Sequence, residues 1–133
     1  MSIESERRVM FPGFYKTVAE IKKGAPLTST GDEHLDVLLW SARMGFSNRQ
    51  LIISFTKWMH GFNVTDVDVD FASLQGELEE AVDAYKNSTI DDTAFELADI
   101  AIYCYGIAQM LGVDLEEYIN RKMQINLERS YDK

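Results

Sequence analysis

The sequence predicts an all-α fold, and two observations support that prediction. Apolar residues recur at three- and four-residue spacing in successive segments, which is the period of an amphipathic helix. Glycines and polar residues that can cap a helix separate these segments. Residues 64–70 alternate valine with aspartate as a strand would, but no partner strand is visible. We therefore expect this stretch to be an extended loop that ends in a helix cap.

The chain has 133 residues, which is enough for one domain with one moderate core. We expect a single all-α domain over residues 1–133, in which 1–45 form a helical N-terminal extension and 47–133 form the core. Within the extension, helices are predicted over residues 9–23 and 32–44. The second of these helices carries four apolar residues on one side: Leu35, Leu38, Leu39 and Trp40.

The first two helices of the core follow. Ser47 or Asn48 can cap the first of them, and Gly61 helps to end it. Its apolar stripe consists of Leu51, Phe55, Trp58 and Phe62. The next helix is predicted over residues 71–86. Its side chains expected to face the core are Leu74, Leu78, Ala81, Val82 and Tyr85.

The last two helices are predicted over residues 92–111 and from Asp114 to about Arg129. Residues 88–91 resemble a capping box for the first, and Asp114 with Glu117 is expected to cap the second. Because residues 92–111 are apolar on most sides, this helix should be central in its bundle, so we expect Glu96 and Asp99 to be at least partly buried. One small bundle cannot cover so many apolar sides, so we expect a dimer or a larger assembly.

Composition excludes several classes of function. The formal net charge of −9 argues against direct binding to nucleic acid, whose backbone would be repelled. No apolar run approaches the roughly 18 residues of a membrane-spanning helix. The single cysteine, Cys104, excludes an intrachain disulfide. We therefore expect a cytoplasmic protein that binds neither nucleic acid nor membrane.

Four carboxylates have a spacing that suits a metal site. Glu77 and Glu80 lie one helical turn apart, and so do Glu96 and Asp99 on the apolar helix over residues 92–111. If the two turns face each other, four anions share one small space, which requires a cation. Oxygen ligands in this number favour Mg²⁺, with Mn²⁺ as the alternative. The competing interpretation is that each of these residues is a solvated charge on a helix surface.

The last helix offers cations. Leu115, Tyr118 and Ile119 are expected to form its buried face, and helical spacing continues that face to a polar set. The members of this set are Lys122, Asn126 and Arg129. A lysine, a neutral donor and an arginine fork together suit a phosphate group. The alternative is that these long side chains extend to solvent at the edge of the bundle.

Several stretches resemble one family. Gly-Glu-Leu-Glu-Glu-Ala-Val-Asp-Ala-Tyr at 76–85, Glu-Leu-Ala-Asp at 96–99 and Lys-x-x-x-Asn-x-x-Arg at 122–129 are similar to the MazG-type all-α nucleoside triphosphate pyrophosphohydrolases. Leu-Gly-Val-Asp-Leu-Glu-Glu at 111–117 is also typical of that family. The resemblance implies a four-helix-bundle-like fold, with residues 1–45 as an additional helical segment. It also implies assembly into a homodimer or homotetramer.

The resemblance further implies an activity. Family members cleave (d)NTPs between the α and β phosphates to give a nucleoside monophosphate and pyrophosphate. On this basis Glu77, Glu80, Glu96 and Asp99 would bind Mg²⁺ or Mn²⁺, and Glu80 or Glu77 would accept the proton of the attacking water. The residues expected to bind the phosphates are Lys122, Asn126 and Arg129.

The family's usual first motif is Glu-Glu-x-x-Glu, and this sequence departs from it. One register gives Glu77 and Glu80 as ligands, with Gly76 in place of the first glutamate. The other register uses Glu79 and Glu80, with Asp83 in place of the last glutamate. We prefer the first, because its side of the helix matches the downstream Asp-Ala-Tyr.

The nucleobase is the part of the substrate on which the sequence is least explicit. In similar family members, an aromatic side chain on the corresponding first bundle helix stacks on the base, which would make Trp58 a base-binding residue. By position alone, on the stripe of Leu51, Phe55 and Phe62, Trp58 is better explained as a core residue. Two other functions remain open: a non-catalytic helical interaction module, which Gly76 would permit, and a related phosphoribosyl-ATP-type pyrophosphatase.

Overall fold

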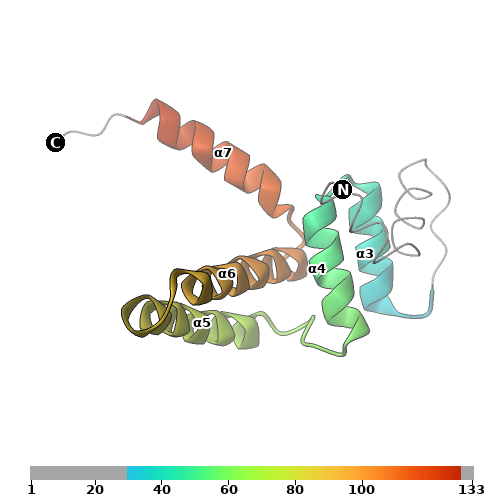
Figure 1. Cartoon of the computed structure of the whole chain (residues 1–133). Helices are drawn as coiled ribbons and strands as arrows, with labels where there is room; N and C mark the ends of the chain where they lie inside the picture. The colour runs from blue at the N-terminus through green and yellow to red at the C-terminus, as the bar shows by residue number, and fades with distance from the viewer. Residues whose placement is uncertain (1–29, 130–133) are drawn as a thin grey trace, which may run out of the picture. The chain divides into compact units, whose positions relative to one another are not determined.

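The structure is a computed structural model that describes residues 30–129, and this part of the chain contains five helices and no strand (Figure 1). The prediction of an all-α fold is confirmed. The helix predicted over residues 9–23 lies outside the described residues. The described residues divide into two compact units, one that ends at Phe62 and one that begins at Asn63. The prediction of one domain over residues 1–133 stays a prediction.

The first unit contains a hairpin of two helices, α3 (Glu33–Arg43) and α4 (Asn48–Met59). Asp32 caps α3 by accepting a hydrogen bond from the backbone N–H of Leu35 at 2.9 Å. Ser47 caps α4 in the same way, as one of the two predicted caps. Gly45 has a φ of 86° in the turn between the helices, where a residue with a Cβ would be strained.

An apolar core holds this hairpin together. Its buried members come from both helices and the turn: Leu38, Ala42, Phe46, Leu51 and Ile52. Leu35, Leu39 and Phe55 pack against them. Two side chains predicted on the apolar stripes are exposed instead, Trp40 and Phe62. Phe62 follows the end of α4, so the helical period that placed it no longer applies there.

In the second unit, α5 (Val67–Asn87) begins four residues earlier than predicted. The expectation of an extended loop over residues 64–70 was therefore wrong for its second half. The reason is local, because the Asp66 side chain accepts from the backbone N–H of Val69 and caps the helix. Asp68 and Asp70 then lie in the first turn, where carboxylates interact favourably with the helix dipole.

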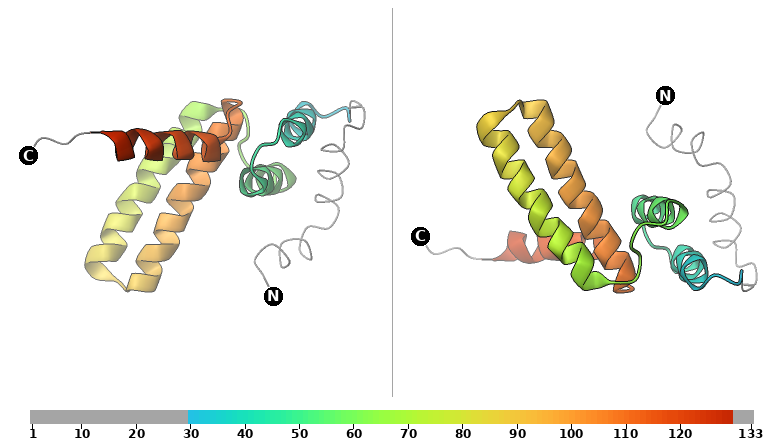
Figure 2. Two further views of the ribbon diagram at one scale, coloured as in Figure 1. Left: turned by 90° about the horizontal axis from the view of Figure 1, so that it is seen from above. Right: turned by 90° about the horizontal axis from the view of Figure 1, so that it is seen from below.

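Helix α6 (Ile90–Met110) lies antiparallel beside α5 (Figures 1 and 2). Thr89 caps α6 by accepting from the backbone N–H of Asp92 at 3.1 Å, one residue later than the predicted capping box. Ser88 donates to the Asp92 carboxylate from the other side. The two caps make the connection between α5 and α6 short and polar.

The side of α5 that faces α6 is only partly the predicted one. Ala81 is buried as predicted, and Ala84 is buried as well, whereas Leu78, Val82 and Tyr85 are exposed. Ala81 and Ala84 each lie one residue before Val82 and Tyr85, so the buried stripe is turned by about 100° from the stripe of larger apolar side chains. Alanines allow the two helix backbones to approach, and the larger apolar side chains of α5 are left on the outside.

Helix α7 (Leu115–Glu128) diverges from α6 (Figure 1). Gly112 has a φ of 76° in the intervening turn, and the chain bends by 109° between the two helices. Asp114 occupies the predicted N-cap position, although its side chain makes no capping hydrogen bond. No residue of α7 is buried, so the expected burial of Tyr118 and Ile119 is not found within one chain.

In the part of the chain that the structure describes, no single helix is both long and apolar enough to cross a membrane. Only α6 and α7 taken together reach that length and composition, and the chain bends by 109° between them.

Candidate metal centre

The carboxylates of the candidate site lie on the facing stripes of α5 and α6. On α5, Glu77 shares the face of Ala81 and Ala84, at helical positions i, i+4 and i+7. On α6, Glu96 lies on the face toward α5, and Asp99 lies one turn further along. The antiparallel arrangement of the two helices therefore brings the middle of each stripe to the same position along the length of the hairpin.

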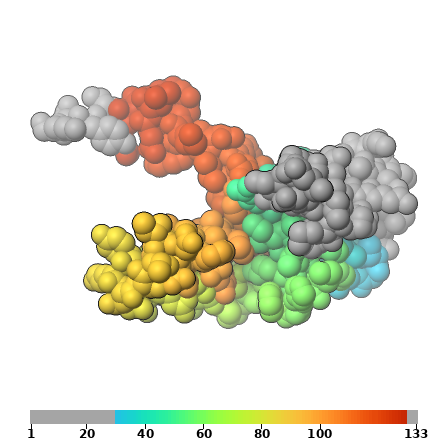
Figure 3. Space-filling view, in the orientation of Figure 1, coloured from blue at the N-terminus to red at the C-terminus, as the bar shows by residue number. Residues whose placement is uncertain are grey.

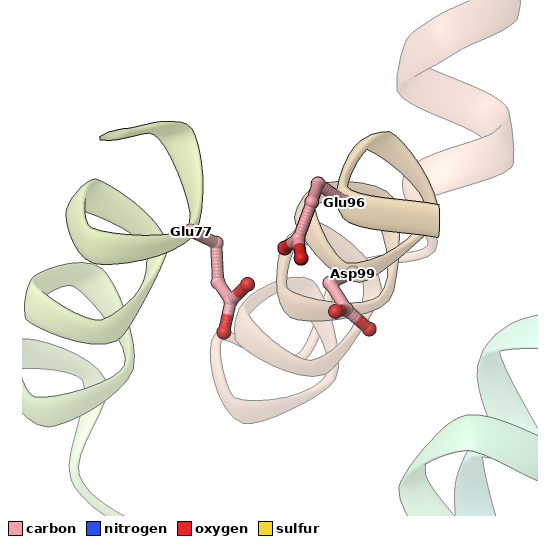
Figure 4. A group of neighbouring side chains, drawn as sticks. All are labelled: Glu77, Glu96 and Asp99. Carbon is pink, nitrogen blue, oxygen red and sulfur yellow. The ribbon is translucent and has the colours of Figure 1, made fainter. Parts of the chain in front are cut away.

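Three carboxylates meet at this level. Glu77, Glu96 and Asp99 each offer an oxygen, and these three oxygens all lie within 4.8 Å of one another. Figure 4 shows the Glu77 side chain of α5 extending toward Glu96 and Asp99 of α6. Glu77 and Glu96 are half-buried, and Asp99 is exposed. The site is thus open to solvent on the side of Asp99.

Glu80 lies beside this group. Its side chain is exposed, and it is within hydrogen-bonding range of both Glu77 and Glu96. Two carboxylates can form such a contact only when a proton lies between them, or when a cation takes the proton's place. All four residues of the preferred register are therefore brought together.

Burial and mutual repulsion perturb the protonation of this group. The pKa of Glu77 is raised to about 7. Burial is the largest cause, the negative charge of Glu80 is the second, and the charges of Asp99 and Glu96 add to them. The pKa of Glu96 is also raised, first by burial and then by the charge of Glu80. The charged form of the cluster is thus disfavoured in the absence of a cation.

Two oxygens of the cluster lack a protein partner. The Oε2 atoms of Glu77 and Glu96 are both buried and accept no hydrogen bond from the described part of the chain. Buried carboxylate oxygens are normally paired or bound to a metal, because their desolvation is otherwise uncompensated. A hard divalent cation such as Mg²⁺ fits this set, since it prefers oxygen ligands and carboxylates in particular.

The alternative register contributes to a neighbouring cavity rather than to the cluster. Glu79 and Asp83 line an open cavity of about 650 Å³ between α5 and α6, together with Glu80 and Glu96. Asp83 accepts a hydrogen bond from the Asn87 side chain at 2.8 Å. The geometry therefore favours Glu77 over Glu79 and Asp83 as the partner of the α6 carboxylates. The cavity lies next to the cluster and has the size of a small-molecule site.

Gly76, which takes the place of the family's first glutamate in the preferred register, also lines this cavity. A Cβ added to Gly76 would meet no atom within 4 Å, so the helix does not need glycine at this position for packing. The glycine enlarges the opening beside Glu80. The sequence indicated the substitution but not that it faces the cavity.

The predicted phosphate-binding residues Lys122, Asn126 and Arg129 are exposed on or just after α7. They share one side of the helix, but the pKa shifts of Glu77 and Glu96 arise from burial and neighbouring carboxylates, not from these cations. Within a single chain, the structure thus does not bring the basic set to the carboxylates.

Trp58 lies on α4 in the first unit, with its ring 5.7 Å from that of Phe55. The pKa of Asp32 is lowered, mainly by the hydrogen bond from the backbone N–H of Leu35 and next by a hydrogen bond from the Trp58 side chain. The indole therefore helps to fasten the end of α4 to the cap of α3. Sequence analysis missed this structural role, because hydrogen bonds between distant segments leave no periodic signal.

Comparison with known families identifies the second unit. Residues 69–133 match the model of the MazG-like family. The second unit, which begins at Asn63, therefore matches this family over most of its length. The matched residues include Glu77, Glu96 and Asp99 and the whole of α7. No curated protein and no solved structure was found to match the chain.

Proposed function

We propose that this protein is a metal-dependent nucleotide pyrophosphohydrolase, which cleaves (d)NTPs between the α and β phosphates. The observation that carries the proposal is the carboxylate cluster of Glu77, Glu96 and Asp99 within a segment that matches the MazG-like family. Members of this family are generally metal-dependent, and their activity is of the pyrophosphohydrolase type. The raised pKa values and the two buried oxygens without partners support a bound cation.

The residues take distinct roles in this proposal. Glu77, Glu96 and Asp99 would hold Mg²⁺ or Mn²⁺, with Glu80 beside them. The bound cation would supply Lewis acidity and neutralise the negative charge of the phosphates. Glu80 is the most accessible glutamate of the group, so it is our candidate to accept the proton of the attacking water.

The substrate carries its own charge, which the site must tolerate. The cavity beside the cluster is lined by carboxylates, so a triphosphate would be repelled from it unless cations intervene. Lys122, Asn126 and Arg129 are proposed to bind the departing pyrophosphate. We also propose a homo-oligomer, because apolar side chains of α5, α6 and α7 are exposed in a single chain.

The test is product analysis with a panel of (d)NTPs. We expect Mg²⁺-dependent release of a nucleoside monophosphate and pyrophosphate, and loss of this activity in Glu96→Gln. Asp83→Asn is the matched control, because it removes a charge from the same cavity but not from the cluster. Release of orthophosphate and a diphosphate would contradict the proposed bond. Activity confined to phosphoribosyl-ATP would assign the related pyrophosphatase, and inactivity on every phosphate ester would favour an interaction module.

A further inference from the structure

The open cavity beside the carboxylate cluster extends along the hairpin of α5 and α6. At one end it is lined by Glu80 and Glu96, which adjoin the cluster, and at the other by Asp83 and Asp92, near the turn that joins the two helices. Asp92 lies roughly 6 Å along α6 from Glu96, at a rise of 1.5 Å per residue. The cavity thus leads from the cluster to the tip of the hairpin, which is at the surface of the molecule (yellow in Figure 3).

The charge of this cavity determines which part of a nucleotide it can accept. Among the described residues that line it, five are acidic and none is basic. Such a lining repels phosphate groups, so the phosphates of a substrate should stay at the cluster, where a cation neutralises them. The nucleoside carries no negative charge, and a cavity of about 650 Å³ is large enough for a small molecule of this size. The nucleoside is therefore the part of the substrate that can extend into the cavity.

Phe95 gives the cavity an apolar aromatic surface. Its side chain lines the cavity and is 73% exposed. Phe95 lies three residues after Asp92 and four residues before Asp99, so the three share one side of α6. The ring is therefore placed between the cluster and the tip, on the path of a base whose phosphate is bound at the cluster. Stacking on an aromatic ring suits every base, because every base has a π face.

Asp92 is a fixed hydrogen-bond acceptor one turn before Phe95. The Ser88 hydroxyl donates to its carboxylate, and the side chain and backbone of Thr89 contribute further hydrogen bonds. The pKa of Asp92 is lowered, first by the hydrogen bond from Ser88, so this carboxylate is ionised at neutral pH. An ionised carboxylate only accepts hydrogen bonds, and its two oxygens have about four lone-pair sites in all. Asp92 can therefore accept an N–H group of a ligand in addition to the bonds that hold it.

An acceptor of this kind distinguishes between bases. Cytosine and adenine carry an exocyclic amino group, which donates hydrogen bonds, whereas uracil, thymine and guanine carry a carbonyl oxygen at the corresponding position. A carboxylate binds the amino group and is repelled by the carbonyl oxygen, because both partners are then acceptors. The bond from an amino group to a charged acceptor is also stronger than a bond between neutral groups. The cavity is thus suited to amino-bearing bases.

From this we propose that the cavity binds the nucleoside of the substrate, with the base stacked on Phe95 and its amino group bound by Asp92. The preferred substrates are then cytosine and adenine nucleotides. The inference deepens the proposed function and rests on it, because it names the substrate class of the same site. Phe95 belongs to the hairpin that holds the cluster, whereas Trp58, the base-binding residue predicted from the sequence, belongs to the first unit.

Two pairs of substrates test the role of Asp92. Cytidine and uridine triphosphates, and likewise adenosine and inosine triphosphates, differ by the exchange of an amino group for a carbonyl oxygen. We expect kcat/KM to be roughly tenfold to a hundredfold higher for the amino-bearing member of each pair, as for loss of a hydrogen bond to a charged group. In Asp92→Asn the preference should fall, because an amide can also donate to a carbonyl oxygen. Equal kcat/KM values within both pairs in the wild type would overturn the proposal.

Asp91→Asn is the matched control for Asp92→Asn. Asp91 lies one residue earlier, in the same first turn of α6, but it does not line the cavity. Both substitutions remove a negative charge that interacts favourably with the helix dipole, so they should have similar effects on stability. Only Asp92→Asn should change the preference for the amino group. An equal change in both variants would assign that preference to the general charge of the turn, against the proposal.

Phe95 tests the stacking step. Phe95→Ala should weaken nucleotide binding roughly tenfold to a hundredfold, whereas Phe95→Trp, which keeps an aromatic surface, should retain it. Binding of inorganic tripolyphosphate with Mg²⁺ should be unchanged in both variants, because this probe has no base. If Phe95→Ala weakens nucleotide and tripolyphosphate binding equally, the ring acts on the metal site and not on the base. Unchanged nucleotide binding together with a smaller particle in light scattering would place Phe95 in an interface between chains. Either result would overturn its stacking role.

A final readout does not depend on activity. Calorimetry measures binding of the α,β-methylene analogues of cytidine and uridine triphosphate with Mg²⁺, which cannot be cleaved at the proposed bond. We expect the wild type to bind the cytidine analogue more tightly, and Asp92→Asn to lose this difference. If that is found but no natural triphosphate is cleaved, the base-binding cavity stands and the proposed function fails. If natural triphosphates are cleaved but the two analogues bind equally, the proposed function stands and the base-binding cavity is overturned.

Discussion

The hairpins α3–α4 and α5–α6 have the same topology, yet they bury different kinds of side chain between their helices. In α3–α4 the interface is made by leucines, an isoleucine and a phenylalanine, and Leu51 is completely buried. In α5–α6 alanines and half-buried carboxylates occupy the interface, while Leu78 is 56% exposed. The first hairpin is therefore stabilised by its own core, whereas the second uses its interface to assemble a charged site.

From this difference we infer which other components the second hairpin would need. A carboxylate at a helix interface is destabilising unless it is protonated or bound to a cation. The large apolar side chains displaced to the outside remain exposed unless another surface covers them. A metal ion and a second copy of the chain would meet these two needs. The predictions below test this contrast, from the largest expected effect to the smallest.

The largest effect is expected from truncating a leucine in each hairpin. Leu51→Ala should destabilise the protein by about 2–5 kcal/mol, because it leaves a cavity in a closed core. Leu78→Ala should change the stability of the isolated chain by no more than about 0.5 kcal/mol, because Leu78 is exposed. Urea denaturation at several protein concentrations measures both.

The concentration series sharpens the comparison. If a second copy covers the outer side of α5, the loss of stability caused by Leu78→Ala should grow with protein concentration, because association then stabilises the wild type more than the variant. The loss in Leu51→Ala should not depend on concentration in that way. A large and concentration-independent loss in Leu78→Ala would show that this side chain is buried within its own chain, against the contrast drawn here.

The second effect concerns the carboxylates themselves. Glu96→Gln and Asp99→Asn should each lower turnover at least about a hundredfold, since loss of a direct ligand should exceed the effect typical of outer-shell changes. Helix content should be unchanged, and the metal-free variants should melt no lower than the wild type, because a crowded anion has been removed. Near-normal turnover in both variants would show that the metal site lies elsewhere.

Much of this second hairpin could be predicted from the sequence. The i, i+3 spacing of Glu96 and Asp99 within an apolar helix predicted that they would be close together and at least partly buried. The burial is confirmed for Glu96, whereas the prediction was wrong for Asp99, which is exposed. The i, i+3 spacing of Glu77 and Glu80 predicted the second pair of carboxylates, on the turn of α5 that faces Glu96 and Asp99. Both inferences depend only on helical geometry, which is local and regular.

The parts that could not be predicted depend on tertiary packing. The predicted buried face of α5 included Leu78, Ala81, Val82 and Tyr85, but the structure buries only Ala81 of these four and adds Ala84 from the adjacent face. An apolar stripe predicts burial without specifying whether the covering surface belongs to the same chain. The direction of α7 was likewise beyond the sequence, since a glycine turn such as that at Gly112 allows many angles.

The third effect separates two roles of Trp58, whose part in binding the base stays a prediction. Trp58→Ala should lower stability by about 1–3 kcal/mol, because a half-buried ring and its hydrogen bond to Asp32 are lost. If Trp58 also stacks on the base, KM should rise about tenfold or more, with a smaller change in kcat. Trp58→Phe is the control, since it keeps an aromatic plane but lacks the N–H donor. An unchanged KM in Trp58→Ala would leave only the structural role.

The fourth effect is an opposite pH dependence in the two hairpins. The pKa of Glu77 is raised from 4.5 to about 7, so its contribution to stability is complete below pH 4.5 and is lost as the pH rises through 7. The pKa of Asp32 is lowered, so its contribution is present above about pH 4 and is lost only in acid. Metal-free protein should therefore melt at a lower temperature at pH 8 than at pH 5.5.

Magnesium and one variant test the source of that trend. Mg²⁺ should raise the melting temperature more at pH 8, where the cluster is ionised, than at pH 5.5. Glu77→Gln removes the titrating group, so its melting temperature should depend less on pH between 5.5 and 8. A wild type whose metal-free stability rises over this range would show that Glu77 is not held in a crowded anionic cluster.

The smallest effect comes from Gly76, where stability and function are expected to separate. Glycine inside a helix is less stable than alanine by roughly 0.5–1 kcal/mol. An added Cβ at this position meets no atom within 4 Å, so Gly76→Ala should stabilise α5 by about that amount. Gly76 also lines the cavity beside Glu80, and a methyl group there narrows the space next to the cluster. We therefore expect a higher melting temperature together with a raised KM for the largest substrates. A stabilised variant with unchanged kinetics would indicate that the substrate approaches the carboxylates from the exposed side of Asp99.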